Sequence, residues 1–408
     1  MSSAHPKTRS VALILGVGIA ITAVNMRAAI GAVSPLLETI REDTGLSTTV
    51  AGLITTLPVV CFGLLSGIAP RLARRFGIDL MIWLTMAGLT AGIVVRLAEP
   101  VFLLFLGTVI IGASIALANV LVPAVIKRDF PERTGLMTGI YTMGIAIGGS
   151  VAAGLMVPIN ERGLPWRQTL ALLALPALVA VLAQLPRLLL NRDALAHAAA
   201  RRTPAPRLWR NRLAWQVSLF MGLQSAVFFG MAAWIPAILY DAGLSREAAG
   251  TMWALCNLAG LPFSLAVPLV AQRLRDQRPI LVVVIAVWAV AIIGLLVAPA
   301  TATLLWMALL GAASGSALSL ALMLIVLRSP DAAHAAALSG MAQAIGYCLA
   351  ATAPFLVGAL RDLTGGWEVS VTTILIVLVP TLFAGWMASR RALVGPPPDA
   401  ATPVLRRT

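Results

Sequence analysis

A single arginine stands inside an apolar run near the start of the chain. Arg27 lies past the middle of a run that extends from about position 11 to about position 37. A charge within a membrane span costs about 2.5–3.5 kcal/mol on insertion scales, so this side chain should face the interior of a helix bundle. The guanidinium is always charged, and its planar fork of donors suits a small carboxylate-like or linear anion. We therefore predict that Arg27 binds an anion.

No acidic residue lies within an apolar run to pair with Arg27. All 16 Asp and Glu residues fall in loops or at the ends of runs, with Glu38 and Asp241 the closest. The alternative is a structural arginine that binds backbone carbonyls or reaches Glu38, about three helical turns away.

The composition places these residues in a membrane. Of 408 residues, 59% are hydrophobic and 11% are charged, and the mean hydropathy is +0.93, whereas soluble domains carry about 25% charged residues. This excludes a cytosolic enzyme, a disordered chain and a secreted disulfide scaffold. Long apolar runs satisfy their own backbone in lipid by forming helices. At about 20–25 residues per span plus short loops, the length allows about twelve helices.

Twelve apolar runs can be marked, and they predict an all-α membrane protein with twelve transmembrane helices. Their bounds are roughly 11–37, 48–70, 80–97, 101–126, 135–158, 168–189, 214–239, 249–271, 280–298, 302–327, 336–360 and 369–388.

The positive charges indicate the orientation of these helices. Of the 30 Lys and Arg residues, 23 lie on the side of the N-terminus, 6 lie on the opposite side, and Arg27 lies within a span. Cytoplasmic loops of membrane proteins carry an excess of Lys and Arg. We therefore expect a multi-pass protein of the cytoplasmic (inner) membrane with both termini in the cytoplasm.

The chain divides into two pseudo-symmetric six-helix halves. Gly45-Leu46-Ser47 recurs as Gly243-Leu244-Ser245 at an offset of 198, and Gly139 matches Gly340 at an offset of 201. Parallel repeats of this kind place a substrate site between the halves, near mid-membrane, and work by rocking one half against the other. The expected domains are an N-terminal bundle (1–190), a cytoplasmic linker (191–212), a C-terminal bundle (213–390) and a disordered cytoplasmic tail (391–408).

The layout resembles the major facilitator superfamily. The loop Leu72-Ala73-Arg74-Arg75-Phe76-Gly77 is similar to the superfamily's motif between helices 2 and 3, with Arg74 in place of the usual aspartate. The resemblance implies a gate at this loop, and the predicted gating residues are Arg71, Arg74 and Arg75. They should face the cytoplasmic end of helix 11, with Arg74 on a backbone carbonyl or on an acid such as Asp129 or Asp331.

A narrower resemblance, to the cyanate and 2-nitroimidazole transporter family, covers most of the N-terminal half. It rests on Asn25-Met26-Arg27 followed by Pro35-Leu36-Leu37, on Leu57-Pro58-Val59-Val60, and on Pro123-Ala124-Val125-Ile126-Lys127-Arg128. That family includes carriers of an anion and of a neutral nitroaromatic, so the resemblance does not fix the substrate.

The resemblance also implies which helices line the substrate cavity, namely helices 1, 4, 7 and 10, with 2, 5, 8 and 11 beside them. Gln343 and Tyr347 are four residues apart and share a helix face, as do Gln224 and Phe228. For each residue the alternative is a helix–helix hydrogen bond or core packing. The predicted substrate-binding residues are Arg27, Asn119, Tyr141, Gln224, Phe228, Asn257, Gln343 and Tyr347.

These features predict a secondary transporter of a small anion, cyanate-like or a small organic acid, rather than an enzyme. The alternatives are a transporter of neutral nitroaromatic compounds such as 2-nitroimidazole and, less favoured, a non-transporting receptor. The partners expected are a small-molecule substrate and the lipid bilayer, with no nucleic acid, no metal and no cofactor, and the protein is expected to be a monomer.

The three histidines, His5, His197 and His334, lie in tails or loops, and a proton relay usually needs an acid or histidine in the membrane. That argues against proton-coupled export of cationic drugs.

Overall fold

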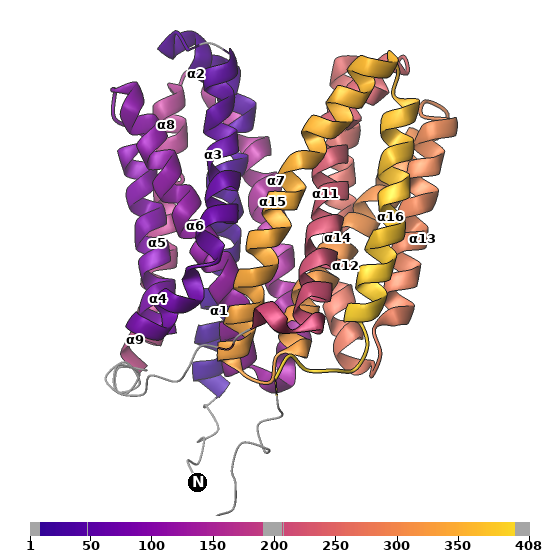
Figure 1. The fold of residues 1–408 in the computed structure, drawn as a ribbon. Helices are drawn as coiled ribbons and strands as arrows, with labels where there is room; N and C mark the ends of the chain where they lie inside the picture. Colours follow the sequence, from indigo (N-terminus) through magenta and orange to yellow (C-terminus); the bar gives the residue numbers. More distant parts are fainter. Residues whose placement is uncertain (1–8, 47, 191–205, 207, 396–408) are drawn as a thin grey trace, which may run out of the picture. The chain divides into compact units, whose positions relative to one another are not determined.

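The computed structural model describes residues 9–46, 48–190, 206 and 208–395, and every regular element in this part of the chain is a helix (Figure 1). The chain forms two compact units. Unit 1 comprises Met1–Val122 and Ile140–Thr203, and unit 2 comprises Pro123–Gly139 and Pro204–Thr408. The predicted linker falls mostly, and the predicted tail largely, outside the described residues.

Unit 1 is built on α1, α5 and α9, which pack against one another. We call the end of a unit where its first helix begins the base, and the opposite end the top. The helices that belong to it wholly or in part are α1 (Arg9–Gly31), α2 (Leu37–Thr44), α3 (Thr48–Ser66), α4 (Ala69–Phe76), α5 (Ile78–Val95), α6 (Val101–Asp129), α7 (Thr134–Glu161), α8 (Trp166–Ala171) and α9 (Ala174–Leu190).

Unit 2 is built on α11, which packs against α15 and α16, and on α14, which packs against α12 and α13. Its helices are α11 (Arg212–Asp241), α12 (Arg246–Arg273), α13 (Arg278–Val297), α14 (Thr303–Arg328), α15 (Ala332–Thr364) and α16 (Glu368–Ala388). The segment that joins α6 to α7 contacts α12: the Gly135 N–H donates to Gln272 Oε1, and Gln272 Nε2 donates to the Glu132 carbonyl at 2.7 Å.

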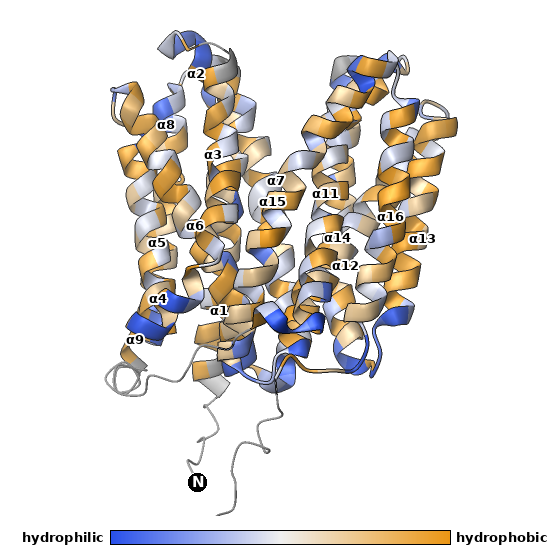
Figure 2. Cartoon of the chain, viewed as in Figure 1, coloured by the Kyte–Doolittle hydropathy of each residue, from blue (hydrophilic) through white to orange (hydrophobic). Residues whose placement is uncertain are grey.

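Within the described residues, eleven helices are long and apolar enough to cross a membrane, or twelve if one bent pair forms a single span. That pair is α3 and α4, which meet at 61°. Counting it as one span gives the twelve helices that the sequence predicts, with bounds that agree to within a few residues at most ends. Orange, apolar residues cover much of the helix surfaces (Figure 2), as expected for faces in contact with lipid.

Three predicted runs prove to be interrupted. The run 11–37 matches one candidate membrane span, Leu13–Leu36, but its α-helix α1 ends at Gly31, ahead of Pro35, and the chain continues as a short 3-10 turn and then α2. The run 48–70 breaks at Gly67 and Ile68, and α4 begins at Ala69, with Pro70 in its first turn. The run 168–189 breaks at Leu172 because Pro176 has no N–H, and its ring would clash with the carbonyl four residues earlier.

Glycines let helices within one unit approach closely. A Cβ added at Gly311 of α14 would lie 1.8 Å from the carbonyl oxygen of Cys256 on α12, and one at Gly315 would lie 2.4 Å from that of Gly260. No side chain fits at those distances. The α12–α14 contact therefore requires glycine, as small-residue interfaces between membrane helices do.

Candidate functional site

Arg27 is half-buried on α1 of unit 1, and its stem lies against α7. A Cβ added at Gly149 would meet the Arg27 Cγ at 2.8 Å, and one at Gly148 would meet the Val24 carbonyl oxygen at 2.0 Å. The glycines of α7 therefore form the surface along which the arginine stem runs. No hydrogen bond or ion pair engages the Arg27 guanidinium among the side chains that the structure describes, which do not include that of Glu38.

Two of the predicted residues meet in unit 1. Tyr141 Oη donates to Asn119 Oδ1 at 3.0 Å, so the side chains join α7 to α6. Both are buried. The hydrogen bond satisfies two polar groups that would be costly to bury alone. It fits a structural contact between two helices, and it equally fits a site where a substrate replaces Asn119 as the acceptor for the Tyr141 hydroxyl.

Three predicted residues lie on α11 and α12 of unit 2. Gln224 is buried and donates to Ser225 Oγ at 2.7 Å and to the Met221 carbonyl at 3.1 Å on its own helix. The Phe228 ring, half-buried, lies 6.1 Å from the Trp253 ring of α12. Asn257 donates to the Trp253 carbonyl at 2.8 Å. Phe228 and Asn257 thus share one neighbour, Trp253, which the sequence did not single out.

The last two predicted residues lie on α15. Gln343 is buried and donates to Ser339 Oγ at 2.9 Å, while Tyr347, one turn further along, is half-buried. Their four-residue spacing on an unbroken helix places them on one face, as predicted.

The predicted gating arginines lie on α4, at the base of unit 1. Arg71 and Arg75 are exposed and Arg74 is partly exposed. The Arg75 guanidinium lies 5.2 Å from the centre of the Phe76 ring. The two acids proposed as partners of Arg74 have other partners, since Asp129 pairs with Arg128 at 2.9 Å and Asp331 pairs with His334 at 2.9 Å and caps α15.

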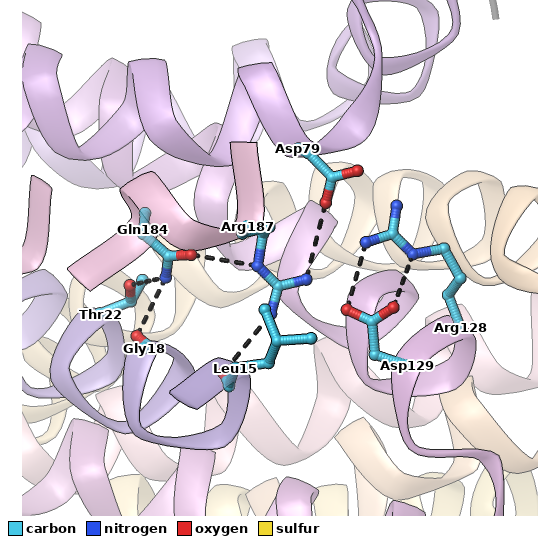
Figure 3. A network of polar contacts seen from close by, with 8 residues as sticks. All are labelled: Leu15, Gly18, Thr22, Asp79, Arg128, Asp129, Gln184 and Arg187. Atoms are coloured by element: carbon cyan, nitrogen blue, oxygen red, sulfur yellow. Dashed lines mark hydrogen bonds and ion pairs between the residues drawn. The ribbon is translucent and has the colours of Figure 1, made fainter. Parts of the chain in front are cut away.

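Sequence reasoning missed a buried charged network at the base of unit 1 (Figure 3). The Arg187 guanidinium on α9 lies 3.6 Å from the Asp79 carboxylate on α5, and both residues are buried. Arg187 Nε also donates to Gln184 Oε1 at 3.1 Å, and Gln184 Nε2 donates to Thr22 Oγ1 of α1 at 2.7 Å. The network therefore joins three helices of the unit. The only signal in the sequence was an acid and an arginine at helix ends, 108 positions apart.

A second buried arginine, Arg96, lies at the end of the predicted run 80–97 and was counted only among the charges on the side opposite the N-terminus. Arg96, only 1% exposed, follows the last residue of α5 and donates to the Ala29 carbonyl of α1 at 3.3 Å. A further cluster, in unit 2, surrounds buried Arg328, which donates to the carbonyls of Ala388 and Ser389 at 2.9 and 2.7 Å and to Gln277.

Neither a metal cluster nor the cavity at the top of unit 2 coincides with the predicted site among the described residues. Within the described residues, no three His, Cys, Asp or Glu side chains gather as a metal site would require. A cavity of about 270 Å³ lies at the top of unit 2, and none of the predicted substrate-binding residues lines it. Its walls include Asp241, Arg361, Trp367 and Glu368.

Comparisons with known proteins give a consistent result. The sequence profile described as Major Facilitator Superfamily matches residues 15–354. The 2-nitroimidazole transporter of Escherichia coli (strain K12) is 38% identical over 379 residues, 93% of this chain and 96% of that protein. The cyanate transport protein CynX of the same organism is 30% identical over 344 residues, 84% of this chain and 88% of that protein.

The fold is similar to that of solved transporters. The structure of the proton:xylose symporter XylE, bound to 6-bromo-6-deoxy-D-glucose, superposes with a TM-score of 0.76 over 94% of this chain and 98% of that chain. The two sequences are 14% identical, so the likeness concerns the fold alone. It confirms the predicted all-helical membrane fold.

Proposed function

This chain belongs to the Major Facilitator Superfamily, and from that premise we propose that it carries a small anion held by Arg27. Members of the family are transporters, so the expectation that the chain is not an enzyme is confirmed. The chain is a multi-pass membrane protein and a secondary transporter related to the cyanate and 2-nitroimidazole transporters.

The observation that carries the proposal is the state of the Arg27 side chain. Its stem lies on the glycines of α7, and its guanidinium has no partner among the described side chains. A charged group kept in a membrane span without a partner is expensive, and an anionic substrate would supply the missing interaction. The guanidinium presents two parallel donors to a linear or carboxylate-like anion, which a lysine ammonium does not.

The relatives support two substrate classes. CynX is named for cyanate, a small linear anion that matches the donor fork of Arg27. The 2-nitroimidazole transporter is named for a neutral nitroaromatic, whose nitro oxygens could accept hydrogen bonds from the same guanidinium. The aromatic pair Phe228 and Trp253, 6.1 Å apart, would then offer a surface for the ring of such a compound.

We further propose the arrangement of the chain in the membrane. The segments 1–190 and 213–390 form the two transport halves, which rock about a site that Arg27, Asn119 and Tyr141 help to line from the first half. The bases carry most of the Lys and Arg residues, so the bases and both termini face the cytoplasm, in the inner membrane. The transporter works as a monomer, and Arg71, Arg74 and Arg75 act at the cytoplasmic gate.

Uptake into proteoliposomes tests the substrate and the role of Arg27 together. Labelled cyanate and labelled 2-nitroimidazole are offered to the wild-type chain, to Arg27→Ala and to Arg27→Lys. We expect cyanate uptake to be lost in Arg27→Ala and to fall at least tenfold in Arg27→Lys, with both variants folded in the membrane.

Arg162→Ala is the matched control, because Arg162 is an exposed arginine at the top of unit 1. It should transport at the wild-type rate. Uptake of 2-nitroimidazole alone would favour the nitroaromatic alternative, and full activity of Arg27→Ala on either compound would exclude the assigned role of Arg27. Binding of a compound without any uptake or exchange would favour a receptor.

A further inference from the structure

An aspartate, a tryptophan and an arginine meet at the top of unit 1. Asp43, near the end of α2, accepts a hydrogen bond from Trp166 Nε1 at 2.9 Å and one from Arg167 Nη1 at 2.9 Å on the same oxygen, Oδ2. The Arg167 guanidinium also lies 4.3 Å from the centre of the Trp166 ring. Trp166 is buried, and it is the first residue of α8. These contacts join α2, which follows the first span of the bundle, to α8, with which its last span begins.

The same three residue types meet at the top of unit 2. Asp241, the last residue of α11, accepts from Trp367 Nε1 at 2.8 Å and from Arg361 Nη2 at 3.4 Å, again through Oδ2. The Arg361 guanidinium lies 5.3 Å from the centre of the Trp367 ring. Trp367 immediately precedes α16, so this cluster joins the first helix of its bundle to the last.

The two clusters occupy equivalent positions in the internal repeat. Asp241 lies 198 positions after Asp43, which is also the spacing of the Gly-Leu-Ser repeat that follows each aspartate. Trp367 lies 201 positions after Trp166. Each aspartate is followed after two positions by a glycine with positive φ, Gly45 at 67° and Gly243 at 101°. The backbone that presents the carboxylate is therefore repeated as well.

The arginine of each cluster makes the same contacts with the aspartate and the tryptophan, although the two arginines come from different helices of the repeat. Arg167 adjoins Trp166 on α8, whereas Arg361 comes from the last turn of α15. Arg167 also donates to the Glu99 carbonyl at 3.3 Å, so the first cluster reaches the α5–α6 turn too. Two different arginine positions reach the same pair of groups, an aspartate carboxylate and the face of a tryptophan, both of which attract a guanidinium.

We propose that these clusters are a duplicated clasp, which fixes the first helix of each half, directly or through α2, to its last helix at the top. A transporter that rocks two halves needs each half to move as a rigid body. The first helix of unit 1 is interrupted after Gly31 and that of unit 2 contains Pro236, so each has a place where its upper part could bend away. The clasp holds that upper part against its own bundle. The proposal is independent of the substrate.

Distances between spin labels within one half test the clasp. The three native cysteines, Cys61, Cys256 and Cys348, are first replaced. One label pair, at exposed positions 42 on α2 and 168 on α8, spans the clasp of unit 1. A second pair, at exposed positions 240 on α11 and 369 on α16, spans that of unit 2. Each distance distribution is measured by double electron–electron resonance on the full chain.

We expect Trp166→Phe, which keeps an aromatic ring but removes the N–H donor, to broaden the distribution of the first pair at least twofold and to leave the second pair unchanged. Trp367→Phe should do the reverse. The matched control is Trp306→Phe. Trp306, on α14, also donates through Nε1, to the carbonyl of Ala298 at 3.0 Å, but Ala298 lies in the turn just after α13, so this bond does not join the first helix of a bundle to its last. The control variant should change neither distribution.

Asp43→Asn and Asp241→Asn provide a second, milder disruption, since each keeps an acceptor oxygen but loses the charge. They should broaden the matching distribution to a smaller extent, and they decide the question if a tryptophan variant fails to fold. Unchanged distributions in all folded variants would overturn the proposal. So would an equal broadening of both pairs by a single variant, which would indicate general loosening rather than a clasp in each half.

Discussion

At the residue scale, the Arg27 stem runs along α7 and Gly149 leaves the room for it. A Cβ at Gly149 would lie 2.8 Å from the Arg27 Cγ, whereas one at Gly154, further along α7, would meet no atom within 4 Å. Because Cγ is near the root of the side chain, the whole guanidinium would have to move. The position of the charge thus depends on a residue that makes no polar contact.

We predict that Gly149→Ala lowers substrate uptake at least tenfold while the protein stays folded. Gly154→Ala is the control on the same helix, with the same gain in helix propensity of about 1 kcal/mol, and it should transport normally. Uptake by both variants in proteoliposomes is the measurement. Equal rates would show that the Arg27 stem is not held where the structure has it.

The buried ion pair of unit 1 offers a second prediction at this scale. Asp79→Asn leaves Arg187 buried beside a neutral group, and breaking a buried pair in this way costs about 3–5 kcal/mol. The double variant Asp79→Leu/Arg187→Met removes both charges and should recover most of that loss. Thermal unfolding of the purified protein in detergent compares the three chains. A double variant no more stable than Asp79→Asn would contradict this account of the pair.

The surroundings of Asp43 allow a prediction of how the clasp of unit 1 responds to pH. The hydrogen bond from Trp166, followed by that from Arg167, lowers the pKa of Asp43. A carboxylate with a lowered pKa contributes its stabilisation above the unfolded value of about 3.9, and the contribution is lost as pH falls through the folded value. We therefore expect the label distance between positions 42 and 168 to stay unchanged from pH 8 to pH 5 and to broaden only below about pH 4. Broadening near pH 6 would mean that another group controls this contact.

At the scale of the helices, the close packing of α14 against α12 depends on glycine residues. Gly311→Ala would place a Cβ 1.8 Å from the Cys256 carbonyl oxygen, so the two helices must separate. We expect it to lower stability by at least about 1–3 kcal/mol, the usual cost of overpacking. Gly250→Ala on α12, where a Cβ meets nothing within 4 Å, should be neutral. Thermal unfolding of both variants is the measurement, and a stable Gly311→Ala chain would contradict the close approach.

The helices themselves could be predicted from the sequence because apolar length and loop charge carry the information. The interruptions were harder to foresee. The break at Leu172 follows from Pro176, which a hydropathy profile does not register. The Asp79–Arg187 pair could not be foreseen, because each residue alone looks like a charged helix end, and only the packing of α5 on α9 brings them together. The clasps were hidden for the same reason, although the repeat spacing of their aspartates was visible.

Polar residues within the spans are harder still to interpret from sequence. Asn119 and Tyr141 were separate candidates, and the structure joins them in one hydrogen bond. Gln224, Asn257 and Gln343 each donate within their own helix. Such bonds satisfy the side chain locally, so type and depth alone do not distinguish a substrate contact from a structural one. Arg27 stands apart because no local carbonyl or described acid takes its charge.

At the scale of the whole molecule, the question is what drives transport. The Arg27 guanidinium offers N–H donors and no acceptor, so it is suited to holding an anion rather than to receiving a proton. His334 lies in the first turn of α15 and pairs with Asp331. The buried acid Asp79 lies in the first turn of α5, at the base of unit 1, beside the Arg187 guanidinium. Within the described residues, every acid and histidine thus lies in a loop, in a short helix or in an end turn of a longer helix, rather than in the middle of a span.

We therefore predict that a substrate gradient alone drives uptake or exchange, and that any pH dependence follows the protonation of the substrate, since only its anionic form would be held by Arg27. Counterflow in proteoliposomes at several pH values, with and without an imposed proton gradient, measures this. Concentrative uptake of a non-titrating substrate under a proton gradient would show that the carrier moves protons itself. Asp79→Asn would then be the decisive variant, because loss of proton-driven uptake with retained counterflow would identify Asp79 as the coupling group.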